Sequence, residues 1–245
     1  MIIIRYHEIG LKGINRKDFE KRLRNNIKDC LNKNNVEFKK IWRLRGRILV
    51  DTDEECPQLN FVFGISTFSY ADELPLDFDT LKQKALESYR PGTFRVTCTR
   101  LEKVFLPSPQ IEQEVGAFVV EKTGAKVSLR QPQTNIQFEI FNNHAYLFTE
   151  KTKGPGGIPV CSEGRVLLLL QNPDSITVGI RMLKRGCALD VLKEKDINYS
   201  KLKEYEYGFR IHELKEIPDY AEAVIVSDTL DSIREYPYFV LRPLI

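Results

Sequence analysis

The sequence predicts an α/β protein built from several small domains, and three observations favour this fold class. A short apolar run at residues 166–170 leads through a turn into an amphipathic helix that ends at Gly186, which is half of a βαβ unit. Before this run, strand-like and helix-like hydrophobic patterns alternate along residues 2–149. Charge and composition also change together near residue 75, where we expect a domain boundary. A chain of 245 residues is long enough for two or three hydrophobic cores.

The first block, residues 1–74, combines a small sheet with a basic helix. Residues 2–6 are predicted to form a strand. Residues 16–31 are predicted to form a helix with Asn15 as its N-cap, because apolar side chains recur there at helical spacing. Apolar residues then alternate with arginines over residues 41–50, a pattern that indicates a basic β-hairpin.

The positive charge of the chain is concentrated at its start. Residues 1–50 carry 14 Lys and Arg against 5 Asp and Glu, whereas residues 51–91 carry 3 against 9. The helix places Lys17 and Arg24 on the face opposite to its apolar side. Two interpretations remain open: a solvated helix face beside a charged edge hairpin, or a surface that contacts the phosphates of RNA.

The second block, residues 75–157, follows an acidic, proline-containing linker at residues 74–79. We expect, in order, a helix to residue 89, a strand at 94–99, a helix at 109–122 and two strands at 135–141 and 144–149. The pair Asn142-Asn143 favours a tight turn between the last two strands. Five basic residues could surround one mouth of this unit, either as ordinary surface charges or as RNA contacts: Arg95, Arg100, Lys103, Lys151 and Lys153.

A glycine loop leads into the third block, residues 158–245. Gly154, Gly156 and Gly157 allow backbone NH groups to approach a ligand or another chain closely. After the buried strand, Asn172 is a suitable helix cap and Pro173 suits the first helical position, where its missing NH costs little.

Further strands are expected at residues 187–192 and 223–227. Only about 36 residues separate Gly186 from the second of these, which leaves room for roughly one crossover between parallel strands. Three tyrosines in this interval could stack on bases, although we favour a role in covering the sheet: Tyr199, Tyr205 and Tyr207.

Composition excludes several classes of protein. No stretch is apolar for the roughly 18 residues that a membrane helix needs, and the N-terminus lacks a signal-peptide pattern, so we expect a cytoplasmic protein without membrane contact. The five cysteines are scattered, without a CxxC pair or a nearby histidine. We therefore expect reduced, buried thiols and no metal site.

Five ordered segments carry a family resemblance. They are RYHEIGLKGINRKDFEKRL at the N-terminus, with His7 at a usual glycine; FVFGISTFSYA; TFRVTCTR with SPQIEQEVGAFVVEKTGAKVSLRQP; GPGGIPV followed by the strand, DS and KRG; and AVIVSDTLDSI with the closing VLRPLI. In this order they resemble the tRNA 4-thiouridine synthetases. The resemblance implies an α+β ferredoxin-like domain at residues 1–74, an α/β THUMP domain at 75–157 and a Rossmann-like, parallel-sheet PP-loop domain at 158–245.

The strand-to-helix turn departs from the family pattern. The family has SGGIDS, a loop whose glycine amides bind the pyrophosphate of ATP at a helix N-terminus, whereas residues 170–175 are LQNPDS. Asp174 and Ser175 are kept, which makes them the candidate ATP- and Mg²⁺-binding residues and Asp174 the candidate catalytic residue. Gln171 and Asn172 replace the glycines and Pro173 removes an NH, so we expect a degenerate loop with doubtful ATP binding.

The PP-loop domain is also expected to be reduced, by evolution, gene splitting or choice of segment, because the family's later regions, with the cysteine associated with sulfur transfer, would follow residue 245. The favoured hypothesis is a tRNA-binding protein that holds the acceptor end while a separate catalytic or sulfur-donor protein completes the thiolation. The alternative is an active ATP-dependent tRNA sulfurtransferase that relies on a separate sulfur donor. A second copy of the chain is a further expected partner. The expected RNA-binding residues are Lys12, Arg16, Lys17, Arg24, Arg95, Arg100, Lys103, Lys151, Lys153, Gly154, Gly156 and Gly157.

Overall fold

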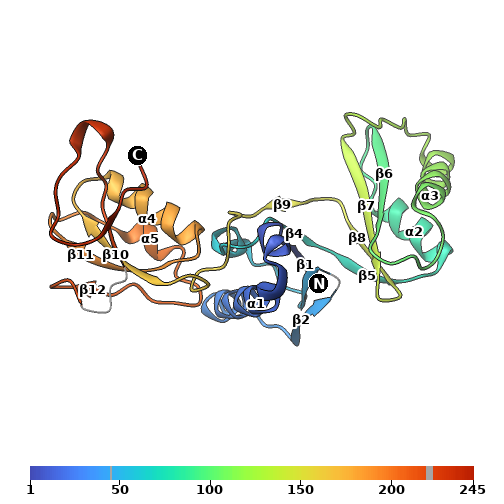
Figure 1. Ribbon diagram of the computed structural model, residues 1–245. Helices are drawn as coiled ribbons and strands as arrows, with labels where there is room; N and C mark the ends of the chain where they lie inside the picture. The colour runs from blue at the N-terminus through green and yellow to red at the C-terminus, as the bar shows by residue number, and fades with distance from the viewer. Residues whose placement is uncertain (45, 219–222) are drawn as a thin grey trace.

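The structure, a computed structural model, describes residues 1–44, 46–218 and 223–245 and confirms the α/β fold class. Figure 1 shows three bodies in a row, with the N-terminal body in the middle, the second on one side and the third on the other. Each body has its own sheet and its own hydrophobic core. Within the described ranges, no helix is long and apolar enough to cross a membrane.

The first body is a five-stranded sheet with one helix across it. The strand order is β2-β3-β1-β4-β9. Helix α1 (Arg16–Lys33) buries Phe19, Leu23 and Ile27 in the core, which is the apolar face that the sequence predicts. The predicted hairpin is confirmed, because β2 and β3 are antiparallel neighbours. The strands are β1 (Ile2–Arg5), β2 (Lys40–Leu44), β3 (Arg47–Asp51), β4 (Thr67–Tyr70) and β9 (Thr152–Lys153), with a 3-10 helix, η3 (Pro57–Phe61), before β4.

Asn15 does not cap helix α1, so this prediction is wrong. Two 3-10 helices, η1 (Glu8–Leu11) and η2 (Gly13–Asn15), run directly into α1. Asn15 already has turn-like backbone angles (φ −79°, ψ −4°) and its side chain accepts no capping hydrogen bond. An N-cap residue needs an extended backbone, which a continuous series of turns does not provide.

The second body is a four-stranded sheet of order β5-β8-β7-β6, in which β6 and β7 are parallel and the other pairs are antiparallel. Helices α2 and α3 contribute Leu81, Ala85, Ile111 and Val115 to its core. Asn142-Asn143 has left-handed backbone angles (φ 53° and 57°), which confirms the tight turn. The elements are β5 (Asp72–Pro75), α2 (Phe78–Ser88), β6 (Phe94–Arg100), α3 (Ser108–Thr123), β7 (Thr134–Phe141) and β8 (His144–Phe148).

Residues 74–79 are not a linker, contrary to the prediction. Leu74 pairs with Ala145 as part of the edge strand β5 and is buried in the core. Asp77 caps α2, since its side chain accepts a hydrogen bond from the Thr80 backbone NH at 2.9 Å. Pro75 is tolerated at the end of an edge strand, where its missing NH leaves no ladder bond unmade. A single residue, Ala71, therefore separates β4 of the first sheet from β5 of the second.

The third body is a parallel sheet of order β12-β11-β10-β13-β14. Helix α4 connects the two longest strands, β10 and β11, as predicted, and Gly186 ends its turn with φ 90°. The elements are β10 (Arg165–Leu170), α4 (Asp174–Lys184), β11 (Ala188–Lys193), α5 (Ser200–Lys203), β12 (Glu213–Leu214), β13 (Val224–Ile225), η4 (Leu230–Ser232) and β14 (Val240–Leu241).

The expectation of roughly one crossover after Gly186 is wrong. One further strand, β12, lies between β11 and β13, so the interval from Gly186 to residue 223 holds two connections between parallel strands rather than one. Strand β12 has only two residues, which leaves most of the interval for the connections. The tyrosines cover hydrophobic core residues, which was the favoured interpretation of their role. Tyr205 stacks on Phe63 with ring centroids 5.0 Å apart, and Tyr207 packs against the core of the first body. All five cysteines are free, and all except the half-buried Cys161 are buried, as predicted.

The glycine loop returns to the first sheet. Thr152 and Lys153 form β9, which pairs with β4, so this part of the block expected to end at residue 157 lies on the N-terminal body. The Gly154 NH donates to the Ser66 carbonyl at 2.9 Å. Gly157 (φ 71°) lies so close to α4 that a Cβ atom there would be 2.3 Å from the Lys184 carbonyl oxygen. These glycines bring the backbone close to other parts of the same chain.

Candidate functional site

The loop between β10 and α4 is closed by hydrogen bonds within the chain. The Ser175 hydroxyl accepts from the backbone NH groups of Gln171 (3.1 Å) and Asn172 (3.4 Å). The Asn172 side chain accepts from the Asp174 NH at 2.9 Å, but α4 begins at Asp174 with Pro173 at the capping position, one residue later than the sequence predicts. The NH groups of Ser175 and Ile176 donate to the carbonyls of Asn172 and Pro173. Each amide of residues 171–176 that has a hydrogen therefore donates within the loop.

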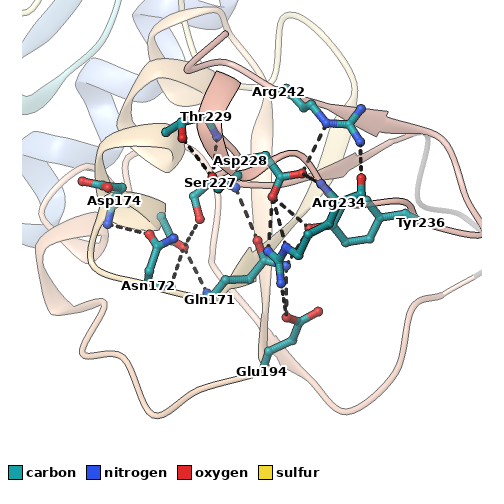
Figure 2. Close-up of polar contacts among 12 residues, drawn as sticks. Gln171, Asn172, Asp174, Glu194, Ser227, Asp228, Thr229, Arg234, Tyr236 and Arg242 are labelled. Atoms are coloured by element: carbon teal, nitrogen blue, oxygen red, sulfur yellow. Dashed lines mark hydrogen bonds and ion pairs between the residues drawn. The ribbon is translucent and has the colours of Figure 1, made fainter.

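The Gln171 side chain occupies the carboxyl end of the sheet. It is 3% exposed, and its Nε2 donates to Glu194 at 3.0 Å and to the Tyr236 hydroxyl at 3.1 Å (Figure 2). Its Oε1 accepts from the Ser227 NH at 3.5 Å. A long polar side chain thus fills the space beside the loop.

Asp228 is the anionic centre of the same network. Its oxygens accept from the Tyr236 hydroxyl at 3.1 Å and from the guanidinium groups of Arg234 (3.2 Å) and Arg242 (3.3 Å). Burial by itself would raise the pKa of Asp228, but these donors and the Arg234 backbone NH outweigh burial and hold the pKa below its ordinary value. Asp228 is a buried anion with its neutralising charges already in place.

The two kept residues of the loop point in different directions. Ser175 is fully buried, and its hydroxyl lies 3.1 Å from that of Ser227. Asp174 is exposed, and Figure 2 shows its carboxylate pointing away from the Gln171 network. In the described part of the chain, no group of three or more His, Cys, Asp or Glu side chains could hold a metal ion.

The basic residues predicted to bind RNA on the first body lie on α1 and just before it, with Lys12 between η1 and η2. Arg16 donates to Glu20 at 2.7 Å, and Arg43 also pairs with Glu20, so this buried carboxylate balances part of the charge. Lys17 and Arg24 are exposed, and Arg24 lines a hollow of about 350 Å³ between α1 and β2. Lys12 reaches across to Glu163 of the third body at 3.6 Å.

The five basic residues predicted around one mouth are dispersed. Arg95 and Arg100 lie at opposite ends of β6, about 17 Å apart along a strand. Arg95 donates to the Leu129 carbonyl at 3.0 Å, Lys103 is exposed beyond the strand, and Lys153 belongs to the first sheet. Burial, with Arg5 and Arg47 nearby, lowers the pKa of Lys151. Lys151 therefore lies where the first and second bodies meet.

An ion cluster at this joint was missed by the sequence reasoning. Arg5 on β1 donates to Glu139 on β7 at 2.6 Å, and Arg47 on β3 donates to the other carboxylate oxygen at 2.9 Å. Arg5 is 6% exposed and Glu139 is 2% exposed. The cluster holds the second body against the sheet of the first. The available signal was a charged residue in each of two mostly apolar segments, IIIR and IQFEIF.

Comparison with known proteins defines the class of the first two bodies. The family model of the ThiI ferredoxin-like domain matches residues 1–69, and that of the THUMP domain matches residues 77–150. The chain is 33% identical over 232 residues to the probable tRNA sulfurtransferase of Thermococcus kodakarensis, and 37% identical over 206 residues to that of Brevibacillus brevis. The chain belongs to the tRNA sulfurtransferase family, also called the tRNA 4-thiouridine synthetases, as the sequence resemblance indicates.

Similar solved structures extend over the whole chain. The crystal structure of PH1313 from Pyrococcus horikoshii has a TM-score of 0.88 at 30% identity and covers 100% of this chain and 94% of that one. A 4-thiouridine synthetase in complex with RNA and bound ATP has a TM-score of 0.80 at 25% identity, covering 99% of this chain and 80% of that one. The matches to the two curated relatives cover 85% and 78% of this chain but only 61% and 51% of theirs.

Proposed function

We propose that this chain binds tRNA through its ferredoxin-like and THUMP domains and takes part in tRNA thiolation without binding ATP in its own loop. The family models, the names of the relatives and the solved RNA complex of similar fold support the tRNA part. Exposed Lys17 and Arg24 supply cations on the first domain, and Lys103 supplies one on the second. A separate protein then provides uridine activation and sulfur.

The loop geometry supports the absence of ATP binding. A pyrophosphate at a helix N-terminus needs backbone NH groups that point at it. Here the amides of Gln171, Asn172 and Asp174 donate to side chains of the same loop, and Pro173 has no NH. The Gln171 side chain adds bulk that two glycines would not. These residues do not fit a bound pyrophosphate without rearrangement of the loop.

Calorimetric titration of ATP with Mg²⁺, with and without bound tRNA, tests this part of the proposal. We expect no saturable heat at millimolar ATP. Saturable binding that disappears in Asp174→Ala, and persists in a Thr177→Ala control on the exposed side of the same helix, would contradict the proposal. That result would favour the alternative, an ATP-dependent tRNA sulfurtransferase in which the exposed Asp174 carboxylate serves the nucleotide site.

The tRNA part is tested by the salt dependence of binding. Lys17→Glu with Arg24→Glu should weaken tRNA binding and lower the slope of log K against log salt by about 0.7 to 0.9 for each phosphate contact removed. The matched control is Lys195→Glu with Lys215→Glu, two exposed lysines at the carboxyl edge of the third sheet. Equal effects of both pairs would mean that only net charge matters. Wild-type protein that fails to bind tRNA would refute the proposal outright.

A further inference from the structure

A cleft lies between the first and third bodies. It has a volume of about 910 Å³ and an apolar and a cationic wall. Leu11 from η1, Ile158 from the glycine loop and Pro243 near the C-terminus form the apolar wall. The cations are Lys12 from the first body and Arg181, Lys184 and Arg185 from the last turn of α4 and the residue after it.

Backbone contacts fix the position of the cationic wall. Gly157 packs against Lys184 without a side chain between them, and the Ile158 NH donates to the Lys184 carbonyl at 3.1 Å. That bond occupies a carbonyl at the negative end of the helix. Arg181 donates to the Pro243 carbonyl at 2.6 Å, which fixes the C-terminal segment beside the cleft. The positions of Lys184 and Arg185 therefore follow from the joint between the bodies.

The charge of the cleft is strongly unbalanced. Four cationic side chains line it against one carboxylate, Glu8, which already accepts the Gly157 NH at 3.0 Å, and only Lys12 of the four has a carboxylate partner, Glu163 at 3.6 Å, among the described residues. Lys184 and Arg185 are exposed and make no ion pair with the residues the structure describes. A cleft with this balance raises the local concentration of anions.

Leu11 in the apolar wall is 88% exposed, and Ile14, three residues later in η2, is 99% exposed. Aliphatic side chains beside cations complement a ligand that carries phosphates together with a flat, poorly hydrated group. An unpaired nucleotide has this chemistry, because its base is splayed away from its charged backbone.

We propose that this cleft binds the RNA backbone and one unpaired base, with Lys184 and Arg185 as phosphate contacts and Leu11 against the base. The inference rests on the proposed tRNA-binding function and adds the third body to the RNA interface. Lys12 lines the cleft and is followed along the chain by Arg16 and Lys17, so the cleft continues the basic surface of the first body. An extended polyanion such as RNA could contact both the cleft and the basic surface of the first body, whereas a small anion would need only one of these two sites.

Fluorescence anisotropy with labelled tRNA and with its isolated acceptor stem tests the phosphate contacts. Lys184→Glu with Arg185→Glu should weaken binding at least tenfold and lower the salt slope by about 1.5. The neutral pair Lys184→Gln with Arg185→Gln keeps an aliphatic stem at residue 184 beside Gly157 and should show an intermediate loss. The control pair Lys195→Glu with Lys215→Glu carries the same charge change at the opposite end of α4 and should change binding less than twofold.

Leu11→Ala tests the base contact, and the exposure of Leu11 means that the fold does not depend on it. We expect several-fold weaker binding of a stem with an unpaired 3′ end and unchanged binding of a blunt stem. Cleft variants that bind tRNA like the control pair, while wild-type protein binds it, would overturn the cleft and leave the proposed function standing. Wild-type protein that binds no tRNA would overturn both. A double variant that lost affinity for inorganic pyrophosphate alone would also overturn the cleft as an RNA site.

Discussion

Removal of the Glu139 carboxylate should destabilise the chain more than removal of a surface carboxylate at the same distance from its partner. Glu139 receives Arg5 at 2.6 Å and Arg47 at 2.9 Å, and the Glu139 and Arg5 side chains are 3% and 7% exposed. The change Glu139→Ala leaves the Arg5 guanidinium buried without its counter-charge. Breaking one side of a buried pair costs about 3–5 kcal/mol.

The structure places the expected loss near the lower end of that range, at about 3 kcal/mol. Arg5 keeps a hydrogen bond to the Ser69 hydroxyl at 3.0 Å and its position over the Phe148 ring. Arg47 is 18% exposed and regains water more easily than Arg5. Replacement of the buried pair, Arg5→Met with Glu139→Leu, should recover part of the loss, because only the more exposed Arg47 then remains without its carboxylate.

The assay is urea unfolding at neutral pH, with Glu87→Ala as the matched control. Glu87 lies 2.7 Å from Lys84, but the two side chains are 49% and 43% exposed, so their pair is screened by water. A loss in Glu139→Ala no larger than that in Glu87→Ala would refute the reasoning. Because the cluster joins the ferredoxin-like and THUMP domains, Glu139→Ala should also weaken tRNA binding at temperatures where the protein is still folded.

Two further predictions concern acid and the glycine joint. Burial would raise the pKa of Glu139, but Arg5 and Arg47 outweigh burial and lower this pKa. The stabilisation by ionised Glu139 is therefore complete above about pH 5 and is lost as pH falls through the lowered pKa. Glu139→Gln should weaken the dependence of the unfolding free energy on pH in acid, and an unchanged dependence would contradict this. Gly157→Ala should lower the melting temperature more than Gly124→Ala. Both glycines have positive φ (71° and 66°), but only at residue 157 would the new Cβ atom meet backbone, at 2.3 Å from the Lys184 carbonyl oxygen. Equal decreases in melting temperature would show that the backbone around Gly157 moves to accommodate the Cβ atom.

Local sequence patterns were sufficient where neighbouring residues decide the conformation. The spacing of Phe19, Leu23 and Ile27 predicted the buried face of α1, and the turn chemistry of Asn142-Asn143 predicted the β7–β8 hairpin. The turn LQNPDS at residues 170–175, with a proline and without glycine, was equally visible in the sequence. Asn15 was misassigned because its residue type suits a cap, whereas the 3-10 turns before it set its backbone angles.

Local sequence patterns could not predict contacts between distant segments of the chain. Thr152 and Lys153 carry no strand pattern and form β9 because β4 offers an unpaired edge beside them. Arg5 and Glu139 are 134 residues apart, and Gln171 meets Tyr236 only because β10 and β13 are neighbours in the sheet. The cleft between Leu11 and Lys184 likewise depends on how two bodies pack.

The sequence by itself therefore determined the fold class, the family resemblance, most helices and strands and the absence of glycine from residues 170–175. Hydrophobic periodicity and turn chemistry act over a few residues and are written directly in the chain. Tertiary structure alone decided that Gln171 fills the end of the sheet, that Arg5 and Arg47 share Glu139, and that Lys12 faces the end of α4. Those contacts depend on strand order and packing summed over the whole molecule, which no local pattern records.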